Sequence, residues 1–121
     1  MKRHESTENY LETILVLTQQ SGKVRSIDIA NDMGFTKPSV SIAMKNLREK
    51  GCIIMDADGY ITLTMQGERL AKCVYERHLV LTKALLAIGV SEQTAKEDAC
   101  RVEHDISDET FTRIKAYLSE K

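Results

Sequence analysis

The sequence predicts a mainly α-helical protein in which an N-terminal winged helix-turn-helix unit precedes a second, helical domain. Apolar residues recur at helical spacing along most of the chain. Residues 26–50 indicate a short helix, a tight turn and a basic helix, and residues 52–63 indicate a β-hairpin directly after them. This order is typical of a winged helix-turn-helix, although another compact three-helix domain could show it. We place the boundary at residue 70, which gives domains 1–70 and 71–121.

Capping residues predict where the helices of the first domain begin. Ser6 can cap a first helix that ends at Ser21-Gly22, and Ser26 can cap a short helix over 27–33. Gly34 permits a left-handed turn, and Thr36 can cap a third helix. Pro38 would lie in its first turn, where a missing N–H costs nothing. We expect its buried side to comprise Val40, Ile42, Ala43, Met44 and Leu47.

The rest of the chain continues this pattern. Residues 52–55 and 60–63 are β-rich runs around the Asp58-Gly59 turn, which predicts the hairpin. Thr64 can cap a long amphipathic helix that reaches about Ile88. Ser91 and Ser107 can cap two further helices with apolar faces, and such leftover faces favour a symmetric homodimer.

The composition of the chain argues against a membrane-spanning, a secreted and a disulfide-rich protein. The 121 residues carry a net charge of −1, and no apolar run approaches the roughly 18 residues of a membrane span. The charged start, residues 1–5, does not resemble a secretory leader. Three widely spaced cysteines do not suggest a disulfide framework. We therefore expect a cytoplasmic protein with no membrane partner.

Positive charge is concentrated in the third predicted helix. Residues 37–50 contain four basic residues and a single acidic one, Glu49. The basic residues are Lys37, Lys45, Arg48 and Lys50. The N-terminal part of such a helix enters the major groove of DNA in this architecture, so double-stranded DNA is the expected partner. Short hydroxyls can bind phosphates or base edges, lysines suit phosphates, and Pro38 can meet a thymine methyl, while an exposed helix surface is the alternative for any single serine. The candidate contacts are Arg25, Ser26, Thr36, Lys37, Pro38, Ser39, Ser41 and Lys45.

Cys100, Glu103 and His104 stand at positions i, i+3 and i+4 of one predicted helix and so share a face. A thiolate, a carboxylate and an imidazole together suit a divalent transition metal rather than Ca²⁺ or Mg²⁺. Three ligands leave a site incomplete, and the spacing alone also allows a buried cysteine beside a solvated pair. The candidates for completing the site are His78, Glu12, Glu8 and Asn9.

The stretch 97–109, the opening residues 8–12 and the segment 75–78 together resemble the diphtheria-toxin-repressor family of iron- and manganese-dependent repressors. The resemblance covers nearly the whole chain. It implies a winged helix-turn-helix followed by a helical metal-binding and dimerisation domain. It also implies that Cys100, Glu103 and His104 are primary ligands, that His78 serves the neighbouring metal position, and that Glu12 is the carboxylate of manganese-type members.

Three positions depart from the family's pattern. Asn9 stands where iron-type members have Met and manganese-type members have Asp, while Thr82 and Lys96 replace a Glu and a His of the ancillary iron-type site. We therefore do not expect a full ancillary site. Because the sequence ends after the last predicted helix, we also do not expect the SH3-like third domain of longer members. The resemblance implies a homodimeric repressor of metal-homeostasis genes on a palindromic operator, activated by Fe²⁺ or Mn²⁺, with Zn²⁺, Co²⁺ or Ni²⁺ as substitutes in vitro.

Two other functions fit the residues less well. A winged-helix regulator could respond to oxidation of Cys100 or Cys73 rather than to metal. A hydrolase would need an orienting group beyond Cys100 and His104, which stand only four apart on one helix. We therefore expect a regulator that is not an enzyme and has no small organic substrate.

Overall fold

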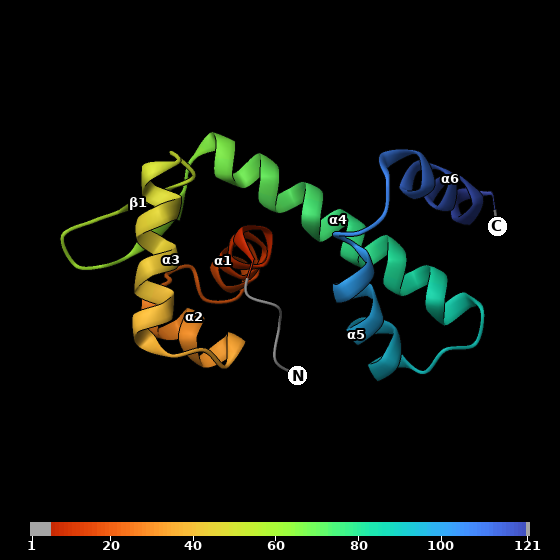
Figure 1. Ribbon diagram of the computed structural model, residues 1–121, viewed down its shortest axis with the longest axis horizontal. Helices are drawn as coiled ribbons and strands as arrows, with labels where there is room; N and C mark the ends of the chain where they lie inside the picture. Colours follow the sequence, from red (N-terminus) through yellow and green to blue (C-terminus); the bar gives the residue numbers. More distant parts are fainter. Residues whose placement is uncertain (1–5, 121) are drawn as a thin grey trace. The chain divides into compact units, whose positions relative to one another are not determined.

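The computed structural model describes residues 6–120, which form six helices and one two-stranded antiparallel sheet (Figure 1). The prediction of a mainly helical protein with a small hairpin is confirmed. The expectation that the charged start is not a secretory leader concerns residues 1–5, which lie outside the described part. The elements in order are α1 (Thr7–Ser21), α2 (Ser26–Met33), α3 (Lys37–Glu49), β1 (Ile53–Met55), β2 (Ile61–Leu63), α4 (Met65–Ala87), α5 (Glu92–Val102) and α6 (Asp108–Ser119).

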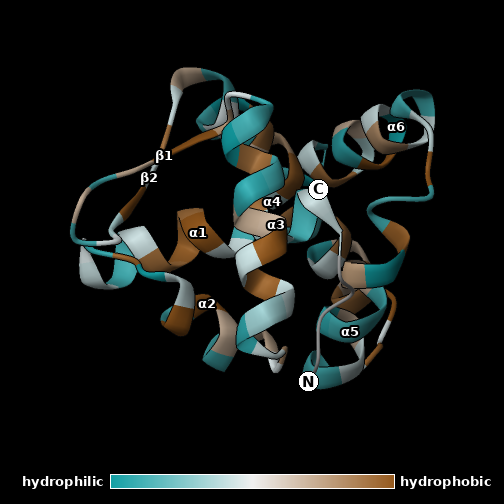
Figure 2. Ribbon diagram, turned by 60° about the vertical axis from the view of Figure 1, so that its left-hand side comes forward, coloured by the Kyte–Doolittle hydropathy of each residue, from teal (hydrophilic) through white to brown (hydrophobic). Residues whose placement is uncertain are grey.

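The chain divides into two compact units after Cys73, a point that lies within α4. In the first unit, α1, α2, α3 and the hairpin surround one apolar core. The largest side chains of this core are fully buried and come from all three helices: Leu11, Ile14, Ile29, Met33, Val40, Met44 and Leu47. Figure 2 shows the mixed hydropathy of α3, which has one apolar side for the core and one polar side for solvent.

Most helix starts follow the predicted caps. The hydroxyls of Ser6, Thr36 and Ser107 accept hydrogen bonds from the backbone N–H groups of Asn9, Ser39 and Thr110, at 3.1, 3.3 and 3.1 Å. Ser26 is not a cap, because α2 starts at Ser26 itself and its N-cap is Arg25. The backbone N–H of Arg25 donates to the carboxylate of Asp28 at 2.9 Å, which fixes this helix start from inside the helix.

The hairpin closes against the beginning of α4. Ile53 pairs with Leu63 across the two strands, and the carboxylate of Asp56 accepts hydrogen bonds from the backbone N–H groups of Asp58 and Tyr60, both at 2.9 Å. A Cβ atom added at Gly67 would lie 1.9 Å from the carbonyl oxygen of Cys52. Only glycine therefore lets α4 approach the hairpin this closely.

The second unit contains the remainder of α4 together with α5 and α6. Ala95, Ala99 and Cys100 form the buried side of α5, and Phe111 is the buried aromatic residue of α6. Along residues 6–120 no helix combines the length and the apolar character that crossing a membrane requires.

Candidate metal centre and nucleic-acid interface

Three side chains of the second unit converge on one point. His78 projects from α4, Cys100 from the last turn of α5 and Glu103 from the residue that caps this helix. One potential ligand atom from each lies within 4.8 Å of the other two. Nitrogen, sulfur and oxygen donors therefore come together from two helices. Cys100 and Glu103 belong to the predicted cluster, while His78, one of the four candidates for completing it, stands here in the place expected for His104.

Glu103 is the centre of this cluster. Its side chain is fully buried, its Oε2 lies 3.3 Å from Nδ1 of His78 and its Oε1 lies 3.4 Å from Nε2 of His104. Among the described residues, neither carboxylate oxygen has a hydrogen-bond donor that satisfies distance and angle. Burying a carboxylate in this way is costly unless a cation or a donor compensates it.

His104 occupies a different local structure from the one predicted. α5 ends at Val102, and Glu103 keeps helical backbone angles, with its N–H donating to the carbonyl of Ala99 at 3.0 Å. His104 and Asp105 lie in the turn that follows. The prediction of one helix carrying all three residues is therefore wrong for His104, because the chain turns after Glu103, where Arg77 binds the carbonyls of Glu103 and Ile106. Its ring nevertheless meets Glu103.

The donor set fits a divalent transition metal. Ligands on opposite sides of one ion, at bond lengths of about 2.0–2.3 Å, lie up to about 4.6 Å apart. The ligand atoms of the cluster lie within 4.8 Å of one another, and Nδ1 of His78 lies 3.3 Å from Oε2 of Glu103. A buried thiolate, imidazole and carboxylate match Fe²⁺, Mn²⁺, Zn²⁺, Co²⁺ or Ni²⁺ better than the all-oxygen shells of Ca²⁺ and Mg²⁺.

The three candidate ligands of α1 belong to the first unit. Asn9 and Glu12 are fully buried, whereas Glu8 is exposed. Seven consecutive residues of α1, from Asn9 to Leu15, are buried, so this helix has polar side chains in its interior as well as apolar ones. Their part in a metal site stays a prediction.

The two departures at the ancillary iron-type site, Thr82 and Lys96, each make a local contact. The hydroxyl of Thr82 donates to the carbonyl of His78 at 2.7 Å, within α4. Lys96 forms an exposed ion pair with Glu92 at 3.1 Å on α5. Neither residue supplies a carboxylate or an imidazole for a second ion.

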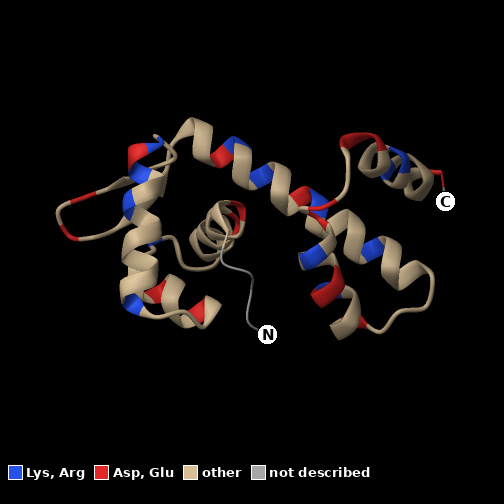
Figure 3. Cartoon of the chain, in the orientation of Figure 1, with Lys and Arg blue, Asp and Glu red and all other residues tan. Residues whose placement is uncertain are grey.

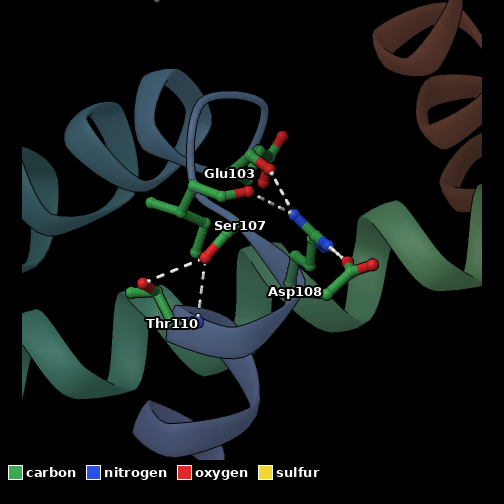
Figure 4. Close-up of polar contacts among 6 residues, drawn as sticks. Glu103, Ser107, Asp108 and Thr110 are labelled. Atoms are coloured by element: carbon green, nitrogen blue, oxygen red, sulfur yellow. Dashed lines mark hydrogen bonds and ion pairs between the residues drawn. The ribbon is translucent and has the colours of Figure 1, made fainter.

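Arg77, which sequence reasoning did not single out, contacts the turn that carries the ligands. Its Nη1 donates to the carbonyls of Glu103 and Ile106, both at 3.2 Å, and its Nη2 pairs with the carboxylate of Asp108. Figure 4 shows Glu103, Ser107, Asp108 and Thr110 around this turn, with the polar contacts dashed. An arginine next to His78 on an amphipathic helix looks like a solvated residue in the sequence, so no signal was available.

The candidate DNA-reading face lies on α3 of the first unit, where Lys and Arg gather along the helix (Figure 3). Lys37, Pro38, Ser41 and Lys45 are exposed, as a reading face requires. Ser39 is half-buried and receives a hydrogen bond from Thr36 Oγ1 at 3.1 Å. Both of these hydroxyls are thus engaged in the capping of the helix.

Ile42 departs from its predicted place in the core. Its side chain is 63% exposed. Pro38, Ile42 and Lys45 stand at i, i+4 and i+7 and so share the outer side of α3, opposite the buried Val40 and Met44. The apolar spacing misled the prediction, because the core needs only one side of this helix.

The other two candidate contacts lie at the start of α2, where Arg25 is exposed and Ser26 half-buried. The guanidinium carbon of Arg25 lies 4.3 Å from the ring centroid of Tyr60, and Nζ of Lys23 lies 5.1 Å from the same centroid. A ring flanked by two cations holds both of them beside the hairpin. Tyr60 and Lys23 were missed because the sequence does not reveal this contact.

Comparisons with known protein families cover nearly all of the chain. Residues 3–61 match the model described as the N-terminal DNA binding domain of iron dependent repressors, and residues 64–120 match the metal binding and dimerisation domain of the same proteins. The transcriptional regulator MntR of Escherichia coli O157:H7 is 35% identical over 115 residues, which cover 95% of this chain and 74% of MntR.

Solved structures give the same result. The manganese regulator SloR superposes with a TM-score of 0.85 at 26% identity, over 96% of this chain and 54% of that one. A manganese-dependent transcriptional repressor in complex with manganese superposes with a TM-score of 0.84 at 29% identity, over 94% of this chain and 53% of that one. The chain thus spans about half the length of these two structures.

Proposed function

The chain belongs to the family of iron-dependent repressors, and from this premise we propose that it represses transcription when a divalent transition metal occupies the site of His78, Cys100 and Glu103. In this proposal it binds operator DNA as a homodimer and controls metal-homeostasis genes. The observation that carries the proposal is the buried convergence of three different donor atoms around a carboxylate that accepts no hydrogen bond within the described residues.

A bound metal ion would supply positive charge and directed bonds, and the residues of the chain would position the ligand atoms. His78 presents its imidazole from α4. Cys100 and Glu103 present their donor atoms to the same point from the end of α5. The charge of a bound cation offsets the cost of burying Glu103. Binding therefore favours the conformation in which α4 and α5 meet, and a ligand can shift an equilibrium only by such a difference in affinity.

We propose Fe²⁺ or Mn²⁺ as the natural ion. The thiolate of Cys100 favours Fe²⁺, whereas the carboxylate of Glu12 and the similarity to MntR and to a manganese-dependent repressor favour Mn²⁺. Zn²⁺, Co²⁺ and Ni²⁺ bind the same donors in vitro. His104, Glu12, Asn9 and Glu8 are the proposed additional ligands, and a fully buried carboxylate such as Glu12 is a common metal ligand.

The DNA side of the proposal rests on α3. Pro38, Ser41 and Lys45 face outward from the part of the helix that enters the major groove in this architecture. Lys37 and Arg25 supply phosphate contacts. Two copies related by a two-fold axis would read a palindromic operator whose half-sites lie about one helical turn apart. A cytoplasmic location follows from this role.

The test measures operator binding by fluorescence anisotropy, starting from metal-free protein. Mn²⁺, Fe²⁺, Co²⁺ and Zn²⁺ are titrated in turn, with Glu103→Gln as the variant and Glu109→Gln, an exposed carboxylate of α6, as its matched control. We expect tight binding only with metal, and its loss in Glu103→Gln alone. Binding that survives a chelator but is lost with peroxide would instead establish oxidation sensing through cysteine.

A further inference from the structure

Arg77 contacts the turn 103–106, which carries Glu103 and His104, more extensively than a solvent-exposed arginine on a helix normally would. Its guanidinium donates to the carbonyls of Glu103 and Ile106, pairs with Asp108, and lies 5.2 Å from the ring centroid of Phe111. The side chain is 22% exposed. One residue of α4 therefore contacts the end of α5, the turn after it and the start of α6.

The contacts divide between two neighbours on α4. His78 faces the side chain of Glu103, with 3.3 Å between Nδ1 and Oε2, whereas Arg77 binds the main-chain carbonyl of the same residue. The backbone and the carboxylate of Glu103 are thus both fixed from adjacent positions. The direction in which the carboxylate points depends on the backbone that carries it, so the guanidinium restricts where Glu103 and His104 can place their donor atoms.

Local contacts also hold this turn. The N–H of Asp105 donates to the carbonyl of Val102 at 2.9 Å, and Ser107 caps α6. The carbonyls of Glu103 and Ile106 both lie after Val102, the last residue of α5, and both accept a hydrogen bond from Arg77. The planar fork of an arginine can serve several acceptors at once, which a lysine ammonium on a flexible stem does less well.

We propose that Arg77 is a positioning residue for metal binding: it holds the turn 103–106 so that Glu103 and His104 present their donors to the ion. The inference rests on the proposed function of the same site. Outer partners that orient metal ligands typically change metal affinity by about 10- to 100-fold when they are removed.

The sign of the effect separates positioning from electrostatics. Arg77 is a cation near a cation site, so its removal would strengthen metal binding if charge alone mattered. If the guanidinium positions the ligands, its removal weakens binding. Arg101 is the matched control, since this exposed arginine lies on α5 and its ion pair within residues 6–120 is a 4.0 Å contact with Asp98.

The experiment compares wild type, Arg77→Gln, Arg77→Lys and Arg101→Gln as full-length proteins. Affinity for Mn²⁺ and Co²⁺ is measured by competition with a chelator, and the Co²⁺ absorption spectrum reports coordination by the thiolate of Cys100. We expect Arg77→Gln to bind both ions about 10- to 100-fold more weakly, with an altered Co²⁺ spectrum. Arg77→Lys should be intermediate, and Arg101→Gln should equal or slightly exceed wild type.

A second readout needs no metal. Amide hydrogen exchange of the metal-free proteins should show faster exchange at Glu103 and Asp105 in Arg77→Gln, while the core of the first unit keeps its protection. Unchanged or stronger metal binding in a folded Arg77→Gln would overturn the inference, as would a loss of protection spread over the whole chain. A wild type that binds neither ion would overturn the proposed function itself, which the exchange measurement does not test.

Discussion

Nδ1 of His78 lies 3.3 Å from Oε2 of Glu103, and the side chain of Glu103 is fully buried. Two potential metal ligands from different helices are therefore already adjacent. In the proposed site, little rearrangement is needed for both side chains to bind one ion. The contribution of each ligand can then be tested by substitutions that keep the shape of the side chain.

Glu103→Gln keeps the volume of the side chain and removes its charge. We expect metal affinity to fall by at least about 100-fold, since losing a ligand costs no less than losing an outer partner of a ligand. Competition with a fluorescent chelator measures this affinity. Glu109→Gln, on the exposed side of α6, should bind as wild type does, and equal affinities for the two variants would remove Glu103 from the site.

Metal should stabilise the fold by an amount that grows with the logarithm of the free metal concentration relative to Kd. At a free concentration of about 1,000 times Kd, one bound ion adds about 4 kcal/mol to the free energy of unfolding. Thermal unfolding with and without Mn²⁺ measures this gain. Ca²⁺ and Mg²⁺ should leave Tm unchanged, because neither prefers thiolate and imidazole ligands. A gain of the same size with Mg²⁺ would point to a site made of oxygen donors alone.

Ile42 should read thymine methyl groups. This side chain is exposed on the same side of α3 as Pro38 and Lys45, and apolar contact with the C5-methyl is how such a residue discriminates bases. We expect Ile42→Ala to weaken operator binding by about 1–2 kcal/mol. Replacing the contacted thymine by uracil should cost wild type about 1 kcal/mol.

The same base change should have no further effect on Ile42→Ala, because the contact is already absent. Anisotropy titrations of both proteins on both operators form a complete double-mutant cycle. Leu70→Ala, an exposed apolar residue of α4, serves as the control. Equal uracil effects in wild type and Ile42→Ala would show that Ile42 does not meet a thymine.

Gly67→Ala should be the most damaging glycine substitution in the first unit. The new methyl group would lie 1.9 Å from a backbone carbonyl oxygen of Cys52, so α4 and the hairpin would have to separate. We expect a loss of about 3 kcal/mol in the free energy of unfolding. Gly89→Ala meets no atom within 4 Å and has only the strain of a φ of +99°, which costs about 1–2 kcal/mol. Urea denaturation compares the two, and equal losses would contradict the clash.

Local signals accounted for most of the fold. Ser6, Thr36 and Ser107 cap helices as predicted, because capping depends only on residues three positions away. Helix ends were harder to predict. His104 falls outside α5, since the end of that helix depends on Arg77 and the turn that follows rather than on spacing alone.

The candidate site was predictable where its chemistry is unusual. A cysteine, a glutamate and a histidine at close spacing are rare enough to draw attention, and two of these residues, Cys100 and Glu103, lie within 4.8 Å of His78, one of the four candidates for completing the site. The exposure of Ile42 and the contacts of Arg77 were not predicted, because each residue looks ordinary in the sequence. An isoleucine in a helix is normally core and an arginine is normally solvated, so only tertiary contacts reveal that each does something else.

In the proposed site, the burial of Glu103 also sets how much metal the protein needs before it responds. A carboxylate held in the interior without a hydrogen bond from any described residue raises the free energy of the metal-free state, and binding an ion releases that energy. Each 1.4 kcal/mol released in this way lowers the half-saturating metal concentration about tenfold. The detection threshold of the sensor can therefore change through the surroundings of a single side chain, with every ligand left in place.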